Sequence, residues 1–254
     1  MRPLTIIANW KMNGSLAAND QLLAELLQHD KFQKKNNNPN NQQFGLCVPY
    51  PYLSQVKTAV QATILNLGAQ DVSDHPYGAY TGDVSANMLK DFECRYVIIG
   101  HSERRQYHQE SDALVARKSK AALLAGITPI VCVGETEAER NEQKTVQVVR
   151  KQLQAVLDLL QSQIDKCIIA YEPVWAIGTG QTPTAEEAQE VHRELRLQLA
   201  KFDNEAASKV PIIYGGSLKP ENAQELLKMP DIDGGLIGGC SLIAKDFLAI
   251  CQAG

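Results

Sequence analysis

The sequence lacks the features that mark several common classes of protein. None of its apolar runs approaches the length of a membrane span, and its N-terminus has neither the long apolar segment nor the small-residue cleavage site of a signal peptide. Charge is mixed, with 25 Lys and Arg against 29 Asp and Glu, a net charge of −4 and no basic block. We therefore expect a cytoplasmic protein that binds neither membranes nor nucleic acid.

Patterns of metal ligands, disulfides and nucleotide sites are also missing. The five histidines show no HxxxH spacing and there is no dense carboxylate cluster, so we expect no metal site. The six cysteines are widely spaced, form no CxxC pair and lie mostly in apolar segments, which is typical of reduced core residues. No glycine-rich dinucleotide turn follows an early strand. The expected chemistry therefore uses protein groups without a cofactor.

Strand-like apolar runs recur along the chain, each followed by a helical pattern. Eight such units within 254 residues predict an α/β fold, a single (β/α)8 barrel domain over residues 1–254, in preference to an open doubly wound sheet. The polar segment from Lys34 to Gln43 should form a surface loop. The expected strands are Leu4 to Ala8, Leu46 to Val48, Ile64 to Leu67, Tyr96 to Ile99, Thr128 to Val133, Cys167 to Tyr171, Val210 to Tyr214, and Leu236 to Ile237.

The sixth of these strands leads into the most informative stretch, CIIAYEPVWAIGTGQTPT. Pro173 cannot donate to a sheet ladder and keeps Glu172 extended, so the carboxylate is presented at the C-terminal tip of the strand. The apolar residues that follow lead into glycines, a pattern typical of a lid that closes over a site. A solvated turn is the alternative. Thr184 and Glu187 form a capping box that predicts a helix beyond the lid.

Two more strands of the expected barrel end in residues that can do chemistry, because the working groups of this fold come from the C-terminal strand ends. Lys11 follows the first strand and must reach either water or an anion. His101 follows the fourth strand, where the positive end of a helix dipole would disfavour its charged form. Glu103 could pair with Lys11 or with the adjacent arginines, in a structural or a catalytic role.

The last two strands end in paired glycines. Gly215 and Gly216 precede Ser217, and Gly238 and Gly239 follow the eighth strand. Backbone N–H groups at such turns can approach a phosphate closely, and phosphate sites of barrels usually form after strands seven and eight. Tight strand-to-helix turns are the alternative interpretation.

The third expected strand runs into a long loop, Gln70 to Ser85. This loop carries Tyr77, Tyr80 and Val84 among turn-forming residues. Loops of this length inside compact domains usually bind something, and aromatic tips favour a protein partner, although the loop could also pack on its own protein.

Taken together, the motifs resemble those of the triosephosphate isomerase family from the first strand to the last. Several matches in the family's order are far more specific than any one of them. The motifs are NWKMNG at Asn9 to Gly14, GHSERR at Gly100 to Arg105, AYEPVWAIGTG at Ala170 to Gly180, YGGS at Tyr214 to Ser217, and GGCSL at Gly238 to Leu242.

The resemblance implies a reaction and a set of roles. It implies interconversion of dihydroxyacetone phosphate and D-glyceraldehyde 3-phosphate through an enediolate, in glycolysis and gluconeogenesis, with Glu172 as the base, His101 as the electrophile and Lys11 as the cation beside the substrate. It also implies a homodimer in which the Tyr77 to Ser85 loop inserts into a neighbour near Lys11 and Met12. Residues implied to bind the substrate or support the site are Asn9, Lys11, Ser102, Glu103, Gly178, Ser217, Gly238 and Gly239.

The chain departs from the family's usual residues at a few places. Gln181 and Pro183 stand at the second hinge of the lid, Cys240 replaces an alanine after paired glycines, and Asp71 stands where asparagine is common. These departures bear on rate and rigidity. Two rival functions remain open on the sequence alone: an aldolase in which Lys11 forms a Schiff base, and a binding protein that keeps the phosphate cradle without the chemistry.

Overall fold

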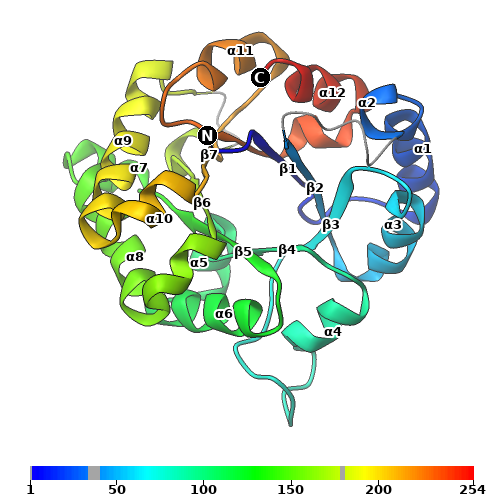
Figure 1. Cartoon of the computed structure of the whole chain (residues 1–254), viewed down its shortest axis with the longest axis horizontal. Helices are drawn as coiled ribbons and strands as arrows, with labels where there is room; N and C mark the ends of the chain where they lie inside the picture. The colour runs from blue at the N-terminus through cyan, green and yellow to red at the C-terminus, as the bar shows by residue number, and fades with distance from the viewer. Residues whose placement is uncertain (1, 34–40, 178–180) are drawn as a thin grey trace.

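The computed structural model describes residues 2–33, 41–177 and 181–254. Eight parallel strands close into a barrel in which each strand pairs with its neighbours in sequence and β1 pairs with β8 (Figure 1). This confirms the predicted single (β/α)8 barrel. The strands are β1 Thr5–Asn9, β2 Gln43–Val48, β3 Leu65–Ala69, β4 Tyr96–Ile99, β5 Thr128–Val133, β6 Ile168–Tyr171, β7 Ile212–Tyr214 and β8 Gly234–Ile237.

Helices surround the barrel on its outer side (Figure 1). The α-helices are α1 Leu16–Leu27, α2 Asp30–Gln33, α3 Leu53–Val60, α4 Ala86–Asp91, α5 Ser102–His108, α6 Asp112–Leu124, α7 Glu137–Asn141, α8 Thr145–Leu160, α9 Ala185–Phe202, α10 Asn204–Lys209, α11 Pro220–Leu227 and α12 Ala244–Gln252. Four short 3₁₀ helices are η1 Tyr50–Tyr52, η2 Gln161–Lys166, η3 Val174–Ala176 and η4 Gly239–Leu242.

Several predicted boundaries differ from the structure. The strand expected at Ile64 to Leu67 is shifted and ends at Ala69, and β7 is shorter than the expected Val210 to Tyr214. Of the polar segment from Lys34 to Gln43 that was expected to be a loop, residues 34–40 lie outside the described residues. Gln43 was wrongly included in it, because this residue begins β2 and pairs with Thr5 in β1. The predicted capping box is confirmed: the Thr184 hydroxyl accepts from Glu187 N, and the Glu187 carboxylate accepts from Thr184 N.

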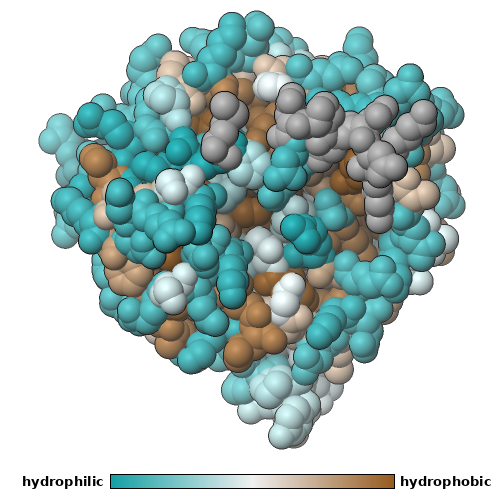
Figure 2. Space-filling view, in the orientation of Figure 1, coloured by the Kyte–Doolittle hydropathy of each residue, from teal (hydrophilic) through white to brown (hydrophobic). Residues whose placement is uncertain are grey.

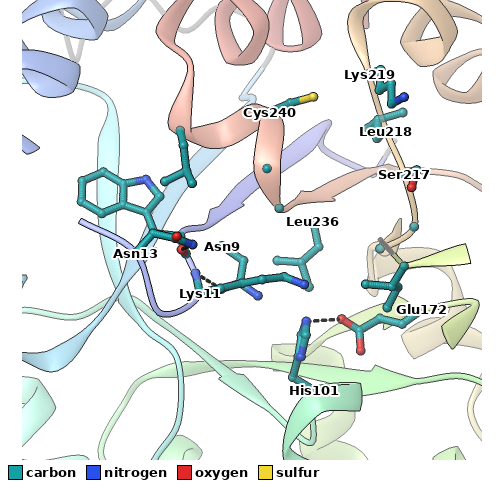
Figure 3. A pocket seen from close by; sticks show the side chains of 17 residues that line it. Asn9, Lys11, Asn13, His101, Glu172, Ser217, Leu218, Lys219, Leu236 and Cys240 are labelled. Atoms are coloured by element: carbon teal, nitrogen blue, oxygen red, sulfur yellow. Dashed lines mark hydrogen bonds and ion pairs between the residues drawn. The ribbon is translucent and has the colours of Figure 1, made fainter. Parts of the chain in front are cut away.

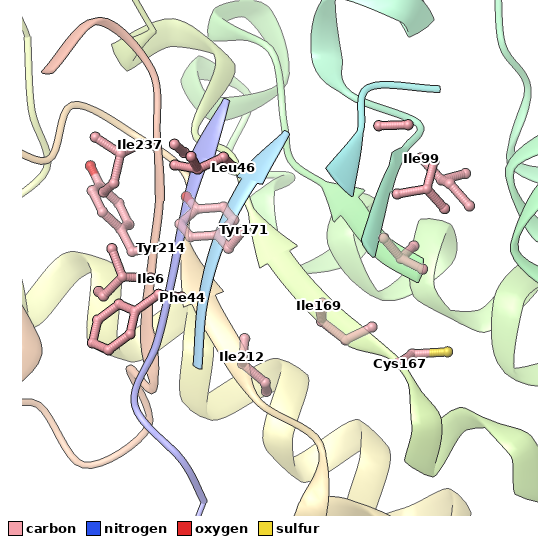
Figure 4. Packing of buried hydrophobic residues seen from close by; sticks show 14 of the residues in the cluster. Ile6, Phe44, Leu46, Ile99, Cys167, Ile169, Tyr171, Ile212, Tyr214 and Ile237 are labelled. Carbon is pink, nitrogen blue, oxygen red and sulfur yellow. The ribbon is translucent and has the colours of Figure 1, made fainter. Parts of the chain in front are cut away.

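Alternate residues of each strand face opposite sides of the barrel wall and form two apolar clusters. In β6, Ile169 and Tyr171 belong to the larger cluster, which Figure 4 shows around the strands and which also contains the inner faces of the helices. Ile168 and Ala170 belong to a smaller cluster that fills the barrel interior. The interior residues are Ile7, Cys47, Tyr96, Ile98, Ile130, Cys132, Ile168, Ala170, Ile213 and Leu236.

This alternation places the site. Continuing the inward parity of Ile7, the last inward position of β1 is Asn9, and the parity of Ile168 and Ala170 continues to Glu172, the residue after β6. Lys11 follows β1 and lines the same pocket. The barrel core therefore ends, at the C-terminal ends of its strands, in a layer of polar side chains. Such a layer requires partners or a ligand, because a buried polar group without a hydrogen bond costs about 1–3 kcal/mol.

No helix in the described part of the chain is long and apolar enough to cross a membrane. All six cysteines are free thiols, as predicted, and five are buried. Cys240 differs because it is only half-buried and lies on the wall of the pocket described below.

Candidate active site

A pocket of about 280 Å³ opens at the C-terminal ends of the strands and contains most of the predicted site residues (Figure 3). Asn9 and Lys11 reach it from the end of β1, His101 from the β4–α5 turn and Glu172 from the end of β6. Ser217, Gly238 and Gly239 line it from the segments that follow β7 and β8. Gly178, the other expected phosphate contact, lies outside the described residues.

Glu172 forms the floor of the pocket and is almost fully buried. Its Oε1 lies 3.0 Å from Nε2 of His101, and its Oε2 accepts a 2.9 Å hydrogen bond from the backbone N–H of Ser102. Burial alone would raise the pKa of this carboxyl, but His101, the Ser102 N–H and Lys11 outweigh burial and hold the pKa below its usual value of 4.5. Glu172 is therefore an ionised carboxylate at neutral pH, which is the form a general base requires.

Two glycines leave the space that Glu172 occupies. A Cβ on Gly134 would lie 1.7 Å from the carbonyl oxygen of Glu172, so the chain after β5 can pass this close only as glycine. A Cβ on Gly215 would lie 2.8 Å from Cγ of Glu172. Gly215 was predicted to approach a ligand, and in the structure its missing side chain also makes room for the carboxylate arm.

His101 is the N-terminal cap of α5, as the sequence predicted. Its Nδ1 accepts the backbone N–H of Glu103 at 3.2 Å, which requires a lone pair on Nδ1 and places the ring proton on Nε2, facing Glu172. Burial would lower the pKa of His101, but Glu172 and Glu103 more than offset burial and leave the pKa above its usual 6.5.

The expectation that the helix dipole alone sets the charge of His101 is therefore incomplete, because it left out both carboxylates. His192 shows the contrast: it is fully buried and burial lowers its pKa to about 3, with carbonyl and charge contacts too weak to compensate. The two histidines differ in whether a carboxylate faces the ring directly.

Lys11 is held in an unusual backbone conformation with φ of 51°. Its N–H donates to Oδ1 of Asn9 at 3.0 Å, and its carbonyl accepts from Nε2 of Gln70 at 2.9 Å. Its ammonium forms a 2.7 Å ion pair with Glu103, so Lys11 and not an adjacent arginine is the ion-pair partner of Glu103. A positive φ in a residue other than glycine is costly and concentrates at functional sites, where surrounding contacts maintain it.

Glu135 was missed by sequence reasoning, which assigned the end of the fifth strand to packing and a turn. Its side chain is fully buried, and its Oε1 accepts from Nε1 of Trp175 at 2.8 Å and from the hydroxyl of Tyr171 at 3.2 Å. Its carbonyl accepts the N–H of Val174 at 3.1 Å. Burial raises the pKa of Glu135 despite these hydrogen bonds. The sequence did contain a signal for Glu135, because a charged residue just beyond a buried strand is the same feature that identified Lys11.

The first half of the predicted lid is therefore anchored on both sides. Glu135 fixes Val174 and Trp175 on the β5 side, and the hydroxyl of Ser217 donates to the carbonyl of Ala176 at 3.0 Å on the β7 side. Arg140 places its guanidinium 3.9 Å from the centre of the Trp175 ring. Ser217, predicted as a phosphate contact, thus lines the pocket while bonded to the lid.

Within the described residues, no three side chains among His, Cys, Asp and Glu are grouped so that they could hold a metal ion. The polar groups of the pocket include instead a carboxylate, an imidazole, ammonium groups, amides, a hydroxyl and exposed backbone. Such a set can move a proton and stabilise negative charge on oxygen.

Comparison with known proteins agrees with this chemistry. The family model described as triosephosphate isomerase matches residues 4–254. Curated relatives named triosephosphate isomerase include one from Polynucleobacter asymbioticus, 53% identical with all of both chains covered, and one from Herminiimonas arsenicoxydans, 54% identical with all of both chains covered. A third, from Thiobacillus denitrificans, is 53% identical, with all of this chain and 99% of the relative covered. Given a family match over almost the whole chain and relatives sharing about half of its residues from end to end, the protein belongs to the triosephosphate isomerase family.

Proposed function

We propose that Glu172, His101 and Lys11 carry out the triose-phosphate isomerase reaction that family membership assigns to this chain, interconverting dihydroxyacetone phosphate and D-glyceraldehyde 3-phosphate. The observation that carries these roles is that an ionised carboxylate, a ring N–H and an ammonium converge on one pocket. Family membership makes the protein an isomerase; the assignment of steps to residues is our proposal.

The proposed reaction moves two protons and needs no oxidant or reductant. Glu172 removes a proton from the carbon beside the carbonyl, the electron pair of that C–H bond forms the C=C bond of an enediolate, and the electron pair of the C=O bond moves onto the carbonyl oxygen. The hydroxyl proton passes to that oxygen, and the protonated carboxyl of Glu172 returns a proton to the adjacent carbon as the other oxygen becomes the new carbonyl. A positioned base of this kind contributes about 100-fold to 10,000-fold to the rate.

Negative charge develops on the substrate oxygens, where His101 and Lys11 act. Nε2–H of His101 faces the pocket and can donate to an oxygen once the substrate lies between it and Glu172. A substrate in that position weakens the contact with the carboxylate that raises the pKa of His101. The N-terminus of α5 then favours the neutral ring, against the remaining carboxylate of Glu103, which lies 3.4 Å from Nδ1. Triosephosphate isomerase is itself the standard example of a catalytic histidine kept neutral by a helix N-terminus, so this point is background and we claim no new result for it.

The substrate phosphate is assigned to the side of the pocket formed by Ser217, Gly238 and Gly239. Gly178, which the family resemblance implies as a further contact, lies outside the described residues. A Cβ added at Gly239 would meet nothing within 4 Å, so this backbone borders open space. A Cβ on Gly238 would lie 3.4 Å from Cε of Lys11, which brings the cradle next to the ammonium. Asn9, Ser102 and Glu103 act behind the reacting groups by holding Lys11 and Glu172.

The aldolase alternative is disfavoured by the state of Lys11. A Schiff-base lysine attacks a carbonyl carbon with a free amine, whereas Nζ of Lys11 is engaged by the Glu103 carboxylate at 2.7 Å. The same ion pair suits a lysine that acts as a fixed positive charge.

We also propose that the protein is a cytoplasmic homodimer. The loop between β3 and α4 projects beyond the helices (Figure 1), with Tyr77 83% exposed and Tyr80 45% exposed. Its base is tied by hydrogen bonds from Ser73 to Val84 and Asp83, so the tips are presented on a defined framework. Apolar surface lies beside the base of this loop in the space-filling view (Figure 2). A second copy would bury these side chains.

The experiment that tests the proposed function is isotope exchange. Purified protein, dialysed against a chelator and free of nucleotides, should incorporate deuterium from solvent at the substrate carbon of dihydroxyacetone phosphate and form glyceraldehyde 3-phosphate. Lack of exchange by the dialysed protein, with activity restored by a divalent ion, would contradict a mechanism that uses protein groups alone.

A further inference from the structure

The approach of an anionic substrate is not favoured by the combined charges of Lys11, Glu103 and Glu172. Lys11 is compensated by Glu103 at 2.7 Å, and Glu172 adds a negative charge at the floor of the pocket. The protein as a whole carries a net charge of −4. Because Glu172 in turn faces His101 at 3.0 Å, these paired groups give an approaching phosphate dianion little long-range attraction, and the net negative charge of the protein lowers the rate of association.

Lys219 adds a positive charge to this pocket. It lines the same pocket, on the β7–α11 segment just beyond Ser217 (Figure 3), and its side chain is exposed. Among the residues that the structure describes, no carboxylate forms an ion pair with it. Its ammonium is therefore the one cation of the described pocket lining whose charge no salt bridge compensates.

The backbone of Lys219 is held in place beside the pocket, which fixes where its side chain begins. The preceding Leu218 is buried, with 3% of its surface exposed, and the following Pro220 begins α11. The N–H of Lys219 donates to Oδ1 of Asn222 at 2.8 Å, and the amide of Asn222 donates to the carbonyl of Ser217 at 3.0 Å. One asparagine thus ties Lys219 to the phosphate side of the pocket.

We propose that Lys219 is a steering and affinity residue for the phosphate group of the substrate, acting through the field at the mouth of the pocket and not on the reacting carbons. This rests on the proposed function, since it assumes that the anion entering the pocket is a triose phosphate. Ser217, Gly238 and Gly239 supply short-range hydrogen bonds to the phosphate, whereas Lys219 supplies the long-range attraction that the rest of the molecule lacks.

The distinguishing property of such a residue is its dependence on salt. The Debye length is about 30 Å at 0.01 M salt and about 3 Å at 1 M, so an exposed charge acts across the pocket mouth in the first case and hardly at all in the second. A residue that merely shapes the pocket would affect binding equally at both salt concentrations.

The test compares three variants with the parent. Lys219→Gln removes the charge, Lys219→Arg keeps it, and Lys228→Gln removes an exposed charge from the opposite end of the same helix. The affinity for inorganic phosphate is measured by calorimetry, and kcat and KM for dihydroxyacetone phosphate are measured in parallel, at about 0.01 M and about 1 M salt.

We expect Lys219→Gln to weaken phosphate binding and to lower kcat/KM by about threefold to tenfold at low salt, through KM and with kcat within about twofold, as expected for one exposed charge acting on a dianion. Both differences should fall below about twofold at high salt. Lys219→Arg and Lys228→Gln should behave as the parent. Equal phosphate affinity in Lys219→Gln and the parent at low salt, an effect that persists at high salt, or an equal effect of Lys228→Gln would overturn the proposal.

The two readouts separate this inference from the proposed function. If the parent does not isomerise the triose phosphate but loses phosphate affinity on Lys219→Gln, the function is wrong and the anion site stands. If the parent isomerises and phosphate binding is indifferent to Lys219, the function stands and the steering role is wrong. A parent that binds no phosphate at low salt contradicts the anion site itself.

Discussion

Glu110 is the most unexpected charged residue outside the pocket, with only 2% of its side chain exposed. Its Oε1 lies 2.6 Å from Nε of Arg104 and 2.5 Å from Nζ of Lys118. Both cations also contact Asp71, at 2.8 and 2.7 Å, which closes a ring of two carboxylates and two cations. Asp71, noted in the sequence as a departure from asparagine, therefore balances the charge of this ring. The ring joins the start of the projecting loop to α5, the helix that His101 caps.

The pH dependence of stability in Glu110→Gln tests whether ionised Glu110 stabilises this ring. Burial raises the pKa of Glu110, but Lys118 and Arg104 outweigh burial and lower the pKa below its usual 4.5. A lowered pKa means that the folded state holds the ionised form more strongly than the unfolded state does. The stabilisation is therefore complete above the usual pKa and lost as pH falls through the folded value. Removing one partner of such a cluster should cost about 3 kcal/mol at pH 7, near the low end for buried pairs because Arg104 is partly exposed.

Thermal unfolding of the parent and of Glu110→Gln, measured from pH 7 down to about pH 2, checks this. The difference in Tm between the parent and Glu110→Gln should decrease as the pH falls below the usual pKa of the carboxyl. Glu142→Gln is the matched control, because Glu142 and its partner Lys144 are exposed and their ion pair should contribute little. A gap that is absent at pH 7, or that stays constant down to low pH, would show that ionised Glu110 does not hold the ring together.

Single residues were predictable where strand position alone decides their environment. Asn9 ends β1 and Glu172 follows β6, and both continue the inward parity of their strands, so the barrel pattern places them in one layer; Lys11 lies just beyond Asn9 at the same end of the barrel. Partners were not predictable in the same way. The pairing of Glu103 with Lys11 spans 92 positions, and the sequence offered arginines as equally reasonable partners. Lys219 was missed because it lies several residues beyond its strand, where side-chain direction depends on the turn.

At the scale of elements, the number and type of strands were predictable but their limits were not. Apolar runs mark the centres of strands, whereas β8 begins at Gly234 and Gly235, which carry no side chain to signal a strand. Gly234 has φ of 151°, and a Cβ there would lie 1.8 Å from the carbonyl oxygen of Thr5, so glycine is required by the approach of β1. The first and last residues of such a strand are determined by pairing with a strand distant in sequence, which the local pattern of apolar residues does not reveal.

The predicted lid was likewise only partly predictable from the sequence. The proline, the apolar tip and the capping box beyond it were visible in the sequence, and the structure confirms that α9 starts at Ala185 after the box at Thr184. The anchoring of Trp175 by Glu135 was not visible, because it joins the ends of β5 and β6 through a single carboxylate oxygen. The end of an element can therefore be predicted from local sequence, whereas the contacts that anchor that end, made by residues distant in sequence, cannot.

At the scale of the whole molecule, the proposed dimer can be tested by light scattering at micromolar concentration. We expect twice the chain mass of 27.9 kDa, because Tyr77 and Met12, which is 97% exposed, would otherwise leave apolar side chains in water. Tyr77→Asp should shift the mass toward that of one chain, whereas Leu197→Asp, at an exposed position of α9 away from the projecting loop, should not. Full activity at a mass of 27.9 kDa would contradict the homodimer.

The central claim is that the buried carboxylate of Glu172 is the base, and Glu172→Gln addresses it with little change in shape. The amide can still accept the N–H of Ser102, so the fold and the binding of a phosphate analogue should persist. The account predicts that turnover of dihydroxyacetone phosphate, measured in a coupled assay on protein whose analogue affinity matches the parent, falls by at least about 100-fold. Turnover within about tenfold of the parent, with analogue binding intact, would contradict the claim and remove Glu172 from the proton transfer.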